Sequence, residues 1–214
     1  MRVAPLVLGL ATLAAVWVGP LPELLPGSFS AHMTMHMGVV AVAAPLLAIG
    51  AAGGKLDPVR RAPALLAPIP ASMVELVAVW AWHAPALHHL ARHSVAGLLV
   101  EQSTFLLSGL LVWCSAFGGE AGRRGNRTAT GIVALLLTSM HMTLLGALLA
   151  LAPRPLYGHA LHAGPASPLT PLQDQHLGGT IMLLAGGIAY LAGGLWLAVR
   201  LLRERESKGV RVPR

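Results

Sequence analysis

Residues 31–37 read AHMTMHM and open a long apolar run of the kind that spans a membrane as a helix. His32 and His36 are four residues apart, so on a helix both imidazoles lie on one face, one turn above the other. Met33 and Met37 form a second such pair, rotated by about 100° around the helix. Imidazole and thioether groups together suit copper, and thioethers favour Cu(I). The alternative is structural: the methionines pad a helix interface and the histidines lie among the lipid headgroups.

The whole chain has the composition of a membrane protein. It has 214 residues, of which 55% are hydrophobic and 11% are charged, whereas soluble domains carry about 25% charged residues. The formal net charge is +7, which we attribute to basic cytoplasmic loops rather than to binding of nucleic acid. The single cysteine, Cys114, excludes an internal disulfide and a metal site built from paired cysteines.

Six segments approach the pattern of about 20 mostly apolar residues that a spanning helix needs. They lie at 3–18, 31–50, 63–82, 95–117, 128–152 and 177–202. We therefore predict an all-α, polytopic membrane helical bundle of about six transmembrane helices. Residues 1–202 form its single integral membrane domain, and residues 203–214 form a basic cytoplasmic tail. The first segment is either a retained anchor or a signal peptide. We favour the anchor, because the sequence GPLP follows at 19–22 where a cleavage site of small residues is expected.

The basic residues are distributed unevenly between the two sides of the predicted bundle. If successive segments cross in alternate directions, 13 of the 15 Lys and Arg residues fall on one side. Only Arg92 and Arg154 fall on the other. Basic loops remain in the cytoplasm, so both the N- and C-termini are predicted to be cytoplasmic.

All ten histidines fall toward the outer side of this bundle. They are His32, His36, His83, His88, His89, His93, His141, His159, His162 and His176. Two acidic residues, Glu75 and Glu101, lie within predicted spans on the same side. A carboxylate inside a span is costly and usually faces the bundle interior with a partner. Each is therefore either a site residue or a structural carboxylate bonded to a neighbour.

The outer ends of the predicted spans can converge on one metal site. Its candidate ligands share imidazole, thioether or carboxylate groups and an outer position: His32, Met33, His36, Met37, His83, Glu101, His141, Asp174 and His176. Carboxylates in such a site can orient the imidazoles. We expect His36, Glu101 and His141 to point into the bundle, close enough to share an ion after small movements.

Five stretches of the chain resemble the multi-spanning CtaG family, the caa-type cytochrome c oxidase assembly factors. They are HMTMHM at 32–37, WAWHAPALHHLA at 80–91, EQSTFLLSGLLVW at 101–113, LLGALLALAPRPLY at 144–157 and LTPLQDQHLGGTIM at 169–182. The resemblance extends over residues 30–195 and puts His32, His36, His83, Glu101 and Asp174 on motif positions. It implies a multi-pass helical bundle in the bacterial inner membrane that is needed to mature a haem-copper oxidase, through copper.

The ligand set and the resemblance together predict an assembly factor that is not an enzyme. It would hold copper at the outer face of the membrane and pass it to an oxidase subunit, so its partners are oxidase subunits and the lipid bilayer. The alternative is a b-type haem electron-transfer protein, with His36 and His141 as axial ligands. A metal transporter ranks third, because its ligands should continue through the membrane and the cytoplasmic halves of the predicted spans carry no histidine or acid.

Overall fold

The computed structural model describes residues 2–19, 28–119, 124–157 and 169–209. These residues form ten helical elements and no strand: α1 (Val3–Trp17), α3 (Phe29–Met37), the π-helix η1 (Gly38–Ala43), α4 (Ala44–Ala51), α5 (Pro58–Arg61), α6 (Pro68–His83), α7 (Pro85–His93), α8 (Val95–Phe117), α9 (Arg124–Ala150) and α10 (Pro171–Gly209). The predicted all-α class is confirmed. His159, His162 and the end of the predicted tail lie outside the described residues.

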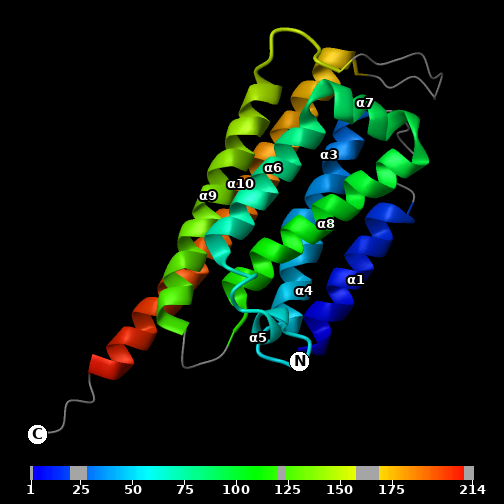
Figure 1. The fold of residues 1–214 in the computed structure, drawn as a ribbon. Coiled ribbons are helices and arrows are strands. Elements are labelled where there is room, and N and C mark those ends of the chain that lie inside the picture. The colour runs from blue at the N-terminus through cyan, green and yellow to red at the C-terminus, as the bar shows by residue number, and fades with distance from the viewer. Residues whose placement is uncertain (1, 20–27, 120–123, 158–168, 210–214) are drawn as a thin grey trace, which may run out of the picture.

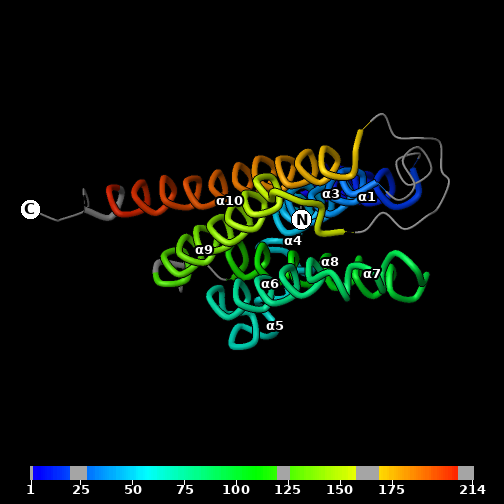
Figure 2. Tube along the Cα trace, turned by 90° about the horizontal axis from the view of Figure 1, so that it is seen from above, coloured from blue at the N-terminus to red at the C-terminus, as the bar shows by residue number. Residues whose placement is uncertain are grey.

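The helices form one bundle in which α9 and α10 lie side by side, as the two views in Figures 1 and 2 show. The elements α3, η1 and α4 follow one another as a continuous helical segment. Its α3 and η1 parts pack on α10, and its η1 and α4 parts pack on α8. α1 packs along η1 and α4, and α6 packs against both α8 and α9. The buried core lies where these helices meet and includes Val40, Phe105, Trp113, Met182 and Tyr190.

Four of the described segments have both the length and the hydropathy of a membrane span. They are Phe29–Ala51, Val95–Phe117, Asn126–Ala150 and Pro171–Glu206. The predicted number of about six is therefore too high. α1 and α6 have 15 and 16 residues, and at 1.5 Å per residue they are only about 23 and 24 Å long. Both fall short of the hydrocarbon core of a bilayer, which is about 30 Å thick.

The π-helix η1 lies in the middle of the span Phe29–Ala51 and leads directly into Pro45. A π-helix bonds each N–H to the carbonyl five residues back, so the next bond would join the nitrogen of Pro45 to the Val40 carbonyl. Proline has no N–H to donate. The Val40 carbonyl instead accepts hydrogen bonds from Trp113 Nε1 at 2.9 Å and from the Tyr190 hydroxyl at 3.4 Å. The interruption thus fastens this span to α8 and α10.

Glycines let α9 and α10 approach until their backbones touch. A Cβ on Gly179 would lie 2.4 Å from the backbone nitrogen of Ala150, and one on Gly146 would lie 2.6 Å from the backbone nitrogen of Leu183. No side chain fits at such distances. Small residues are the usual means of close helix packing in a membrane, so these two glycines fix the spacing of the pair.

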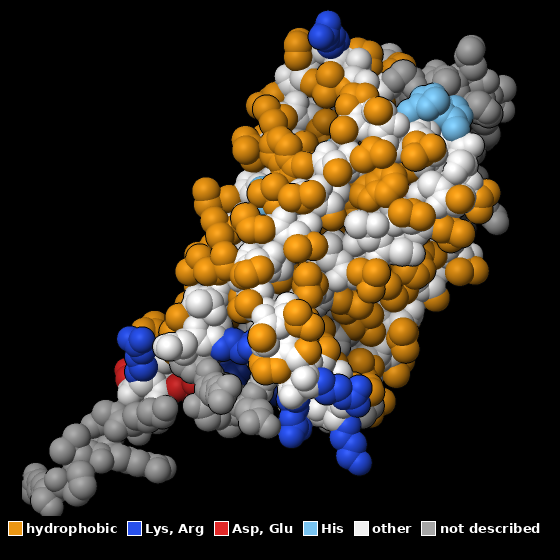
Figure 3. All heavy atoms as spheres, in the orientation of Figure 1, with side chains coloured by type: hydrophobic (Ala, Val, Ile, Leu, Met, Phe, Trp, Pro, Cys, Tyr) orange, Lys and Arg blue, Asp and Glu red, His pale blue; other side chains and the backbone are white. Residues whose placement is uncertain are grey.

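The two ends of the bundle differ in charge. The start of α1, the short helix α5 and the end of α10 lie at one end (Figure 1). Figure 3 shows most of the visible Lys and Arg side chains at this end, apolar side chains along the flank, and histidine side chains with further basic atoms at the opposite end. The structure thus separates the basic end from the histidine-rich end. That the basic end faces the cytoplasm is a prediction from the positive-inside rule.

Candidate metal centre

The first turn of α3, which carries the histidine pair, is held by a carboxylate from another helix. Asp174 of α10 accepts hydrogen bonds from the backbone nitrogens of Phe29 at 2.6 Å and Ser30 at 3.2 Å. It also accepts from the hydroxyls of Ser28 at 2.8 Å and Ser30 at 2.5 Å. The first N–H groups of a helix have no partner within the helix, so Asp174 caps α3 and fixes where it begins.

His32 and His36 are both buried and face the histidines of α6 and α7. The ring centroid of His32 lies 5.2 Å from that of His88 and 6.2 Å from that of His83. The ring centroid of His36 lies 5.4 Å from that of His83. Four imidazoles from three helices therefore form one continuous cluster, which we call the histidine cluster: His32, His36, His83 and His88.

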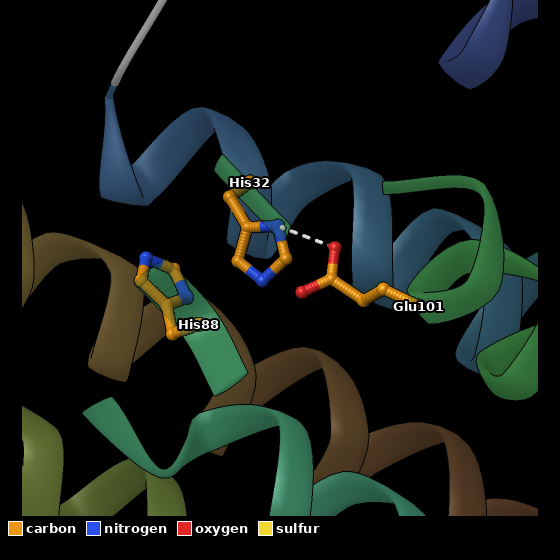
Figure 4. A group of neighbouring side chains, drawn as sticks. All are labelled: His32, His88 and Glu101. Carbon is orange, nitrogen blue, oxygen red and sulfur yellow. Dashed lines mark ion pairs between the residues drawn. The ribbon is translucent and has the colours of Figure 1, made fainter. Parts of the chain in front are cut away.

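Three donor atoms in and beside this cluster already approach the geometry of a metal site. One ring nitrogen from each of His32 and His88 and one carboxylate oxygen of Glu101 lie within 4.8 Å of one another, and all three residues are buried. Figure 4 shows His32 between the other two, with its Nδ1 3.7 Å from Glu101 Oε2. A point central to such a triangle is about 2.8 Å from each atom. Bonds of about 2.0–2.1 Å, as zinc makes to imidazole, would need each ligand to move less than about 1 Å.

Glu101 also forms an ion pair with Arg92 of α7. The Arg92 guanidinium donates a hydrogen bond to Glu101 Oε2 through Nη2. Arg92 follows His88 by four residues, so both side chains leave the same face of α7. The charge of the fully buried carboxylate is thus balanced by a cation on the helix that also supplies an imidazole. A metal ion that used Oε2 would compete with the guanidinium for this oxygen.

Six potential ligand atoms of His32, His36, His83 and Glu101 are buried and have no hydrogen-bond partner among the described residues. They are both ring nitrogens of His32, both ring nitrogens of His36, Nε2 of His83 and Oε1 of Glu101. A buried polar atom without a partner costs about 1–3 kcal/mol, and folded proteins rarely leave several together. Imidazole nitrogens and a carboxylate oxygen are suitable ligands for a transition-metal ion. The donor set therefore fits a bound metal.

Aromatic side chains enclose the cluster. Phe105 of α8 lies 3.9 Å from the ring of His36, between centroids. Tyr157, which follows α9, stacks on Phe29 at 4.6 Å and lies 4.4 Å from His88. Burial raises the pKa of the Tyr157 hydroxyl, so it stays protonated and donates a hydrogen bond to the carbonyl of His83 at 2.8 Å. These rings exclude water, and electrostatic interactions strengthen in such surroundings.

The methionines of the opening motif face a different helix from the histidines. The Cγ of Met33 would lie 3.0 Å from a Cβ placed on Gly178, and the Sδ of Met37 would lie 3.5 Å from one placed on Gly186. Both glycines belong to α10. The two thioethers therefore fill the contact between α3 and α10, while the imidazoles point toward α6, α7 and α8.

Three other candidate ligands lie outside the cluster. The carboxylate of Asp174 is used in capping α3, and the Nε2 of His176 lies 2.9 Å from the carbonyl oxygen of Ala152. His141 is buried on α9, and among the described residues no ring contact joins it to the histidine cluster. Glu101 joins His32 and His88, and the expected convergence of His141 with His36 and Glu101, within about 10 Å, stays a prediction.

The second buried acid within the spans, Glu75, belongs to a separate polar group deeper in the bundle. The Tyr190 hydroxyl of α10 lies 2.5 Å from Glu75 Oε1 and also contacts the Val40 carbonyl. Of the two alternatives that the sequence leaves open for this carboxylate, the geometry matches the structural one.

Sequence reasoning missed His88, Arg92 and Tyr157 as site residues. The predicted spans 63–82 and 95–117 leave only a short connection between them, whereas Pro85–His93 of this connection is helical. Two signals were present. Pro85 is at the start of the helix, where proline is favoured, and residues 88 and 92 are spaced so as to share a face.

The start of the last span also differs from the prediction, because α10 begins at Pro171 rather than at 177. Thr170 and Gln173 cap it reciprocally, because each side chain accepts a hydrogen bond from the backbone nitrogen of the other.

The fold and the site define a helical membrane protein with a buried imidazole and carboxylate cluster near one end of its bundle. Comparison with protein families gives a match to the cytochrome c oxidase caa3 assembly factor model over residues 1–204. The chain therefore belongs to the cytochrome c oxidase caa3 assembly factor family, as its motifs indicate. No curated protein and no solved structure matches the chain.

Proposed function

We propose that this assembly factor binds a copper ion in the histidine cluster and transfers it to an oxidase subunit at the outer face of the bacterial inner membrane. One observation carries the proposal: donor atoms of His32, His88 and Glu101 lie within 4.8 Å of one another, buried among aromatic rings. Its membership of an oxidase assembly family supplies the recipient. The role is delivery of a metal, and no catalytic step is needed for it.

The nature of the ligands favours copper in its oxidised form. The described cluster offers imidazole and carboxylate groups, and the thioethers of Met33 and Met37 lie against α10. Among divalent metals of the first transition row, copper binds such ligands most tightly. His36 and His83 lie next to the three-donor group and provide further imidazoles for an ion that moves deeper.

The haem alternative has less geometric support. Axial ligation needs two imidazoles on opposite sides of a flat macrocycle. The ring of His36 instead packs on Phe105 at 3.9 Å and lies 5.4 Å from His83, between centroids. An optical spectrum of the purified protein distinguishes the two hypotheses, because haem gives a Soret band and copper alone does not.

The test is copper binding by the detergent-purified protein, measured by elemental analysis and electron paramagnetic resonance. The wild type should bind copper with nitrogen ligands visible in the spectrum. His32→Ala should weaken copper binding by more than roughly 10–100-fold, which is the cost of losing a residue that only orients a metal ligand. His89→Ala is the matched control, since His89 is an exposed histidine of α7, about 100° around the helix from His88. Equal binding by His32→Ala and His89→Ala would refute the proposal.

A second measurement ties the site to assembly. A host strain that carries His32→Ala in place of the wild type should insert the protein normally but produce oxidase with less copper and less activity. Added copper should restore part of this activity, because a weakened site fills by mass action. Oxidase with a normal copper content, at normal levels of the variant, would contradict a role in delivery.

A further inference from the structure

An apolar groove runs along the half of the bundle remote from the histidine cluster. It lies between α4 and α10, with α8 behind it, and has a volume of about 820 Å³. Pro45 contributes to the wall formed by α4, Trp196 to the wall formed by α10, and Trp113 and Phe117 to the back. The groove exists because α10 packs on α3 and η1 and diverges from α4 beyond them.

Basic side chains mark one end of this groove. Arg2, which precedes α1, and Arg200 of α10 both line it. Arg200 donates a hydrogen bond to Glu204 at 3.0 Å through Nε and lies 5.7 Å from the centre of the Trp196 ring. The two Nη atoms carry the other four of the five N–H donors of the guanidinium. No acidic residue is among the described residues that line the groove. Glu204, which forms an ion pair with Arg200, is not among these lining residues. The groove is therefore apolar along its length and carries basic residues at the end formed by Arg2 and Arg200.

We propose that the groove binds one anionic phospholipid. Its phosphate would lie at Arg2 and Arg200, and an acyl chain would extend past Trp196 toward Trp113 and Phe117. Arginine binds phosphate through paired hydrogen bonds as well as through charge. Anionic lipids are attracted to basic residues at the membrane surface, and these two arginines belong to the basic end of the bundle.

The charge of the groove favours an anionic lipid over an apolar helix of a partner protein. Its volume of about 820 Å³ lies within the range of about 300–1,000 Å³ that ligand pockets have, which is enough for the acyl chain and part of a headgroup. The basic end has no partner in an apolar helix, whereas a phosphate can pair with it.

The two tryptophans in the groove permit a direct test. Purified protein is reconstituted into vesicles of phosphatidylcholine and phosphatidylglycerol, in which either lipid carries brominated acyl chains that quench nearby tryptophan fluorescence. In the wild type, brominated phosphatidylglycerol should quench more strongly than brominated phosphatidylcholine at the same fraction. The relative affinity for phosphatidylglycerol should be roughly tenfold or more, given two arginines at the membrane surface. The Trp113→Phe, Trp196→Phe variant should lose most of the difference, because the other three tryptophans do not line the groove.

Variants that change the charge or the shape of the groove distinguish a specific lipid site from non-specific attraction of anionic lipids to the basic surface. The double variant Arg2→Gln, Arg200→Gln should abolish the preference for phosphatidylglycerol. The double variant Arg60→Gln, Arg61→Gln, which removes two basic residues near the same end, should retain this preference. Ala192→Leu narrows the groove at an exposed helical position and should reduce quenching by either lipid. Equal quenching by the two lipids in the wild type would overturn the proposal. So would equal losses in the two arginine variants, or quenching that Ala192→Leu leaves unchanged.

Discussion

The Arg92 guanidinium lies against Glu101 Oε2, the carboxylate oxygen that is also 3.7 Å from Nδ1 of His32. A cation of the protein thus occupies one side of the carboxylate that a metal would use. The side chain of Arg92 is 26% exposed, while that of Glu101 is fully buried. Arg92 can therefore move toward the surface. In the proposed site, a metal that used Oε2 would compete with the guanidinium, whereas one that used the unpartnered Oε1 would not.

Arg92→Gln should lower the thermal stability of the metal-free protein and strengthen metal binding. Removing one partner of a buried ion pair costs up to about 3–5 kcal/mol, and less here because Arg92 reaches the surface. The vacated carboxylate then attracts copper without competition, so copper should raise the melting temperature of this variant more than that of the wild type. Thermal unfolding in detergent with and without copper measures both effects. Arg154→Gln, at the other basic residue predicted on the outer side, should show neither. If copper stabilises the wild type more than Arg92→Gln, Arg92 supports the metal rather than competing with it.

Asp174→Ala tests whether this carboxylate caps a helix or binds metal. It removes the acceptor for two backbone and two hydroxyl groups at the start of α3. Loss of a helix cap costs about 0.5–2 kcal/mol, so the melting temperature should fall with or without copper. The number of copper ions bound per chain should not change. Thr180→Ala, at an exposed position further along α10, is the control. A loss of bound copper in a folded Asp174→Ala protein would indicate that Asp174 is a metal ligand.

The class of fold could be predicted from the sequence because a bilayer selects helices by composition and length. The segment 95–117 has the same bounds in the prediction and in the structure. The number of spans was overestimated because apolar composition alone does not show where prolines such as Pro68 begin a helix. For α6 this start leaves 16 residues instead of the 20 that the apolar run suggests.

The site was predicted only in part. His32, His36, His83 and Glu101 lie together, and their histidine and acid character inside apolar segments was the signal. His88 was missed because the nine residues of α7 are too polar to indicate burial. Its burial depends on tertiary contacts: α7 packs on α6 and α8, and the ring of His88 packs near His32 and Tyr157. The role of Asp174 depends on residues about 145 positions away in the chain, and no local pattern contains that information.

The orientation of the bundle can be tested with two engineered cysteines. Cys114, the only native cysteine, is buried, and Cys114→Ala removes it. Leu87→Cys then places a thiol on α7, at the predicted outer end, and Leu65→Cys places one between α5 and α6, at the predicted cytoplasmic end. Both leucines are exposed. In intact cells a membrane-impermeant maleimide should label only Leu87→Cys, and permeabilised cells should allow labelling of both. Labelling of Leu65→Cys alone in intact cells would reverse the orientation.

Two glycines of α10 should respond oppositely to alanine. A Cβ on Gly179 would lie 2.4 Å from the backbone nitrogen of Ala150, so Gly179→Ala must push α9 and α10 apart. Overpacking of this kind costs about 1–3 kcal/mol. A Cβ on Gly194 would meet the side chain of Leu136 at 3.4 Å, which is ordinary contact, and alanine favours a helix by up to about 1 kcal/mol. Thermal unfolding followed by circular dichroism should therefore show a loss for Gly179→Ala and no loss for Gly194→Ala. Equal effects would mean that the backbone contact does not set the spacing of the pair.

Replacing both methionines of the opening motif by leucine separates sulfur ligation from packing. The side chains of Met33 and Met37 lie against Gly178 and Gly186 of α10, on a different side of α3 from the imidazoles. Leucine keeps their volume and apolar character at a cost below about 1.5 kcal/mol each. The variant should therefore bind copper nearly as the wild type does, in both oxidation states, whereas His36→Ala should bind it more weakly.

Competition with a Cu(I) chelator is the decisive measurement, because thioethers favour Cu(I). If the methionine variant loses as much Cu(I) affinity as His36→Ala while its stability is unchanged, the thioethers are ligands. α3 would then have to rotate about its axis to bring them to the imidazoles. Since Asp174 fixes the first turn of α3 through four hydrogen bonds, Asp174→Ala should make that rotation easier and raise the Cu(I) affinity. If α3 instead keeps its orientation, Asp174→Ala leaves the Cu(I) affinity unchanged, and the methionines act only in packing.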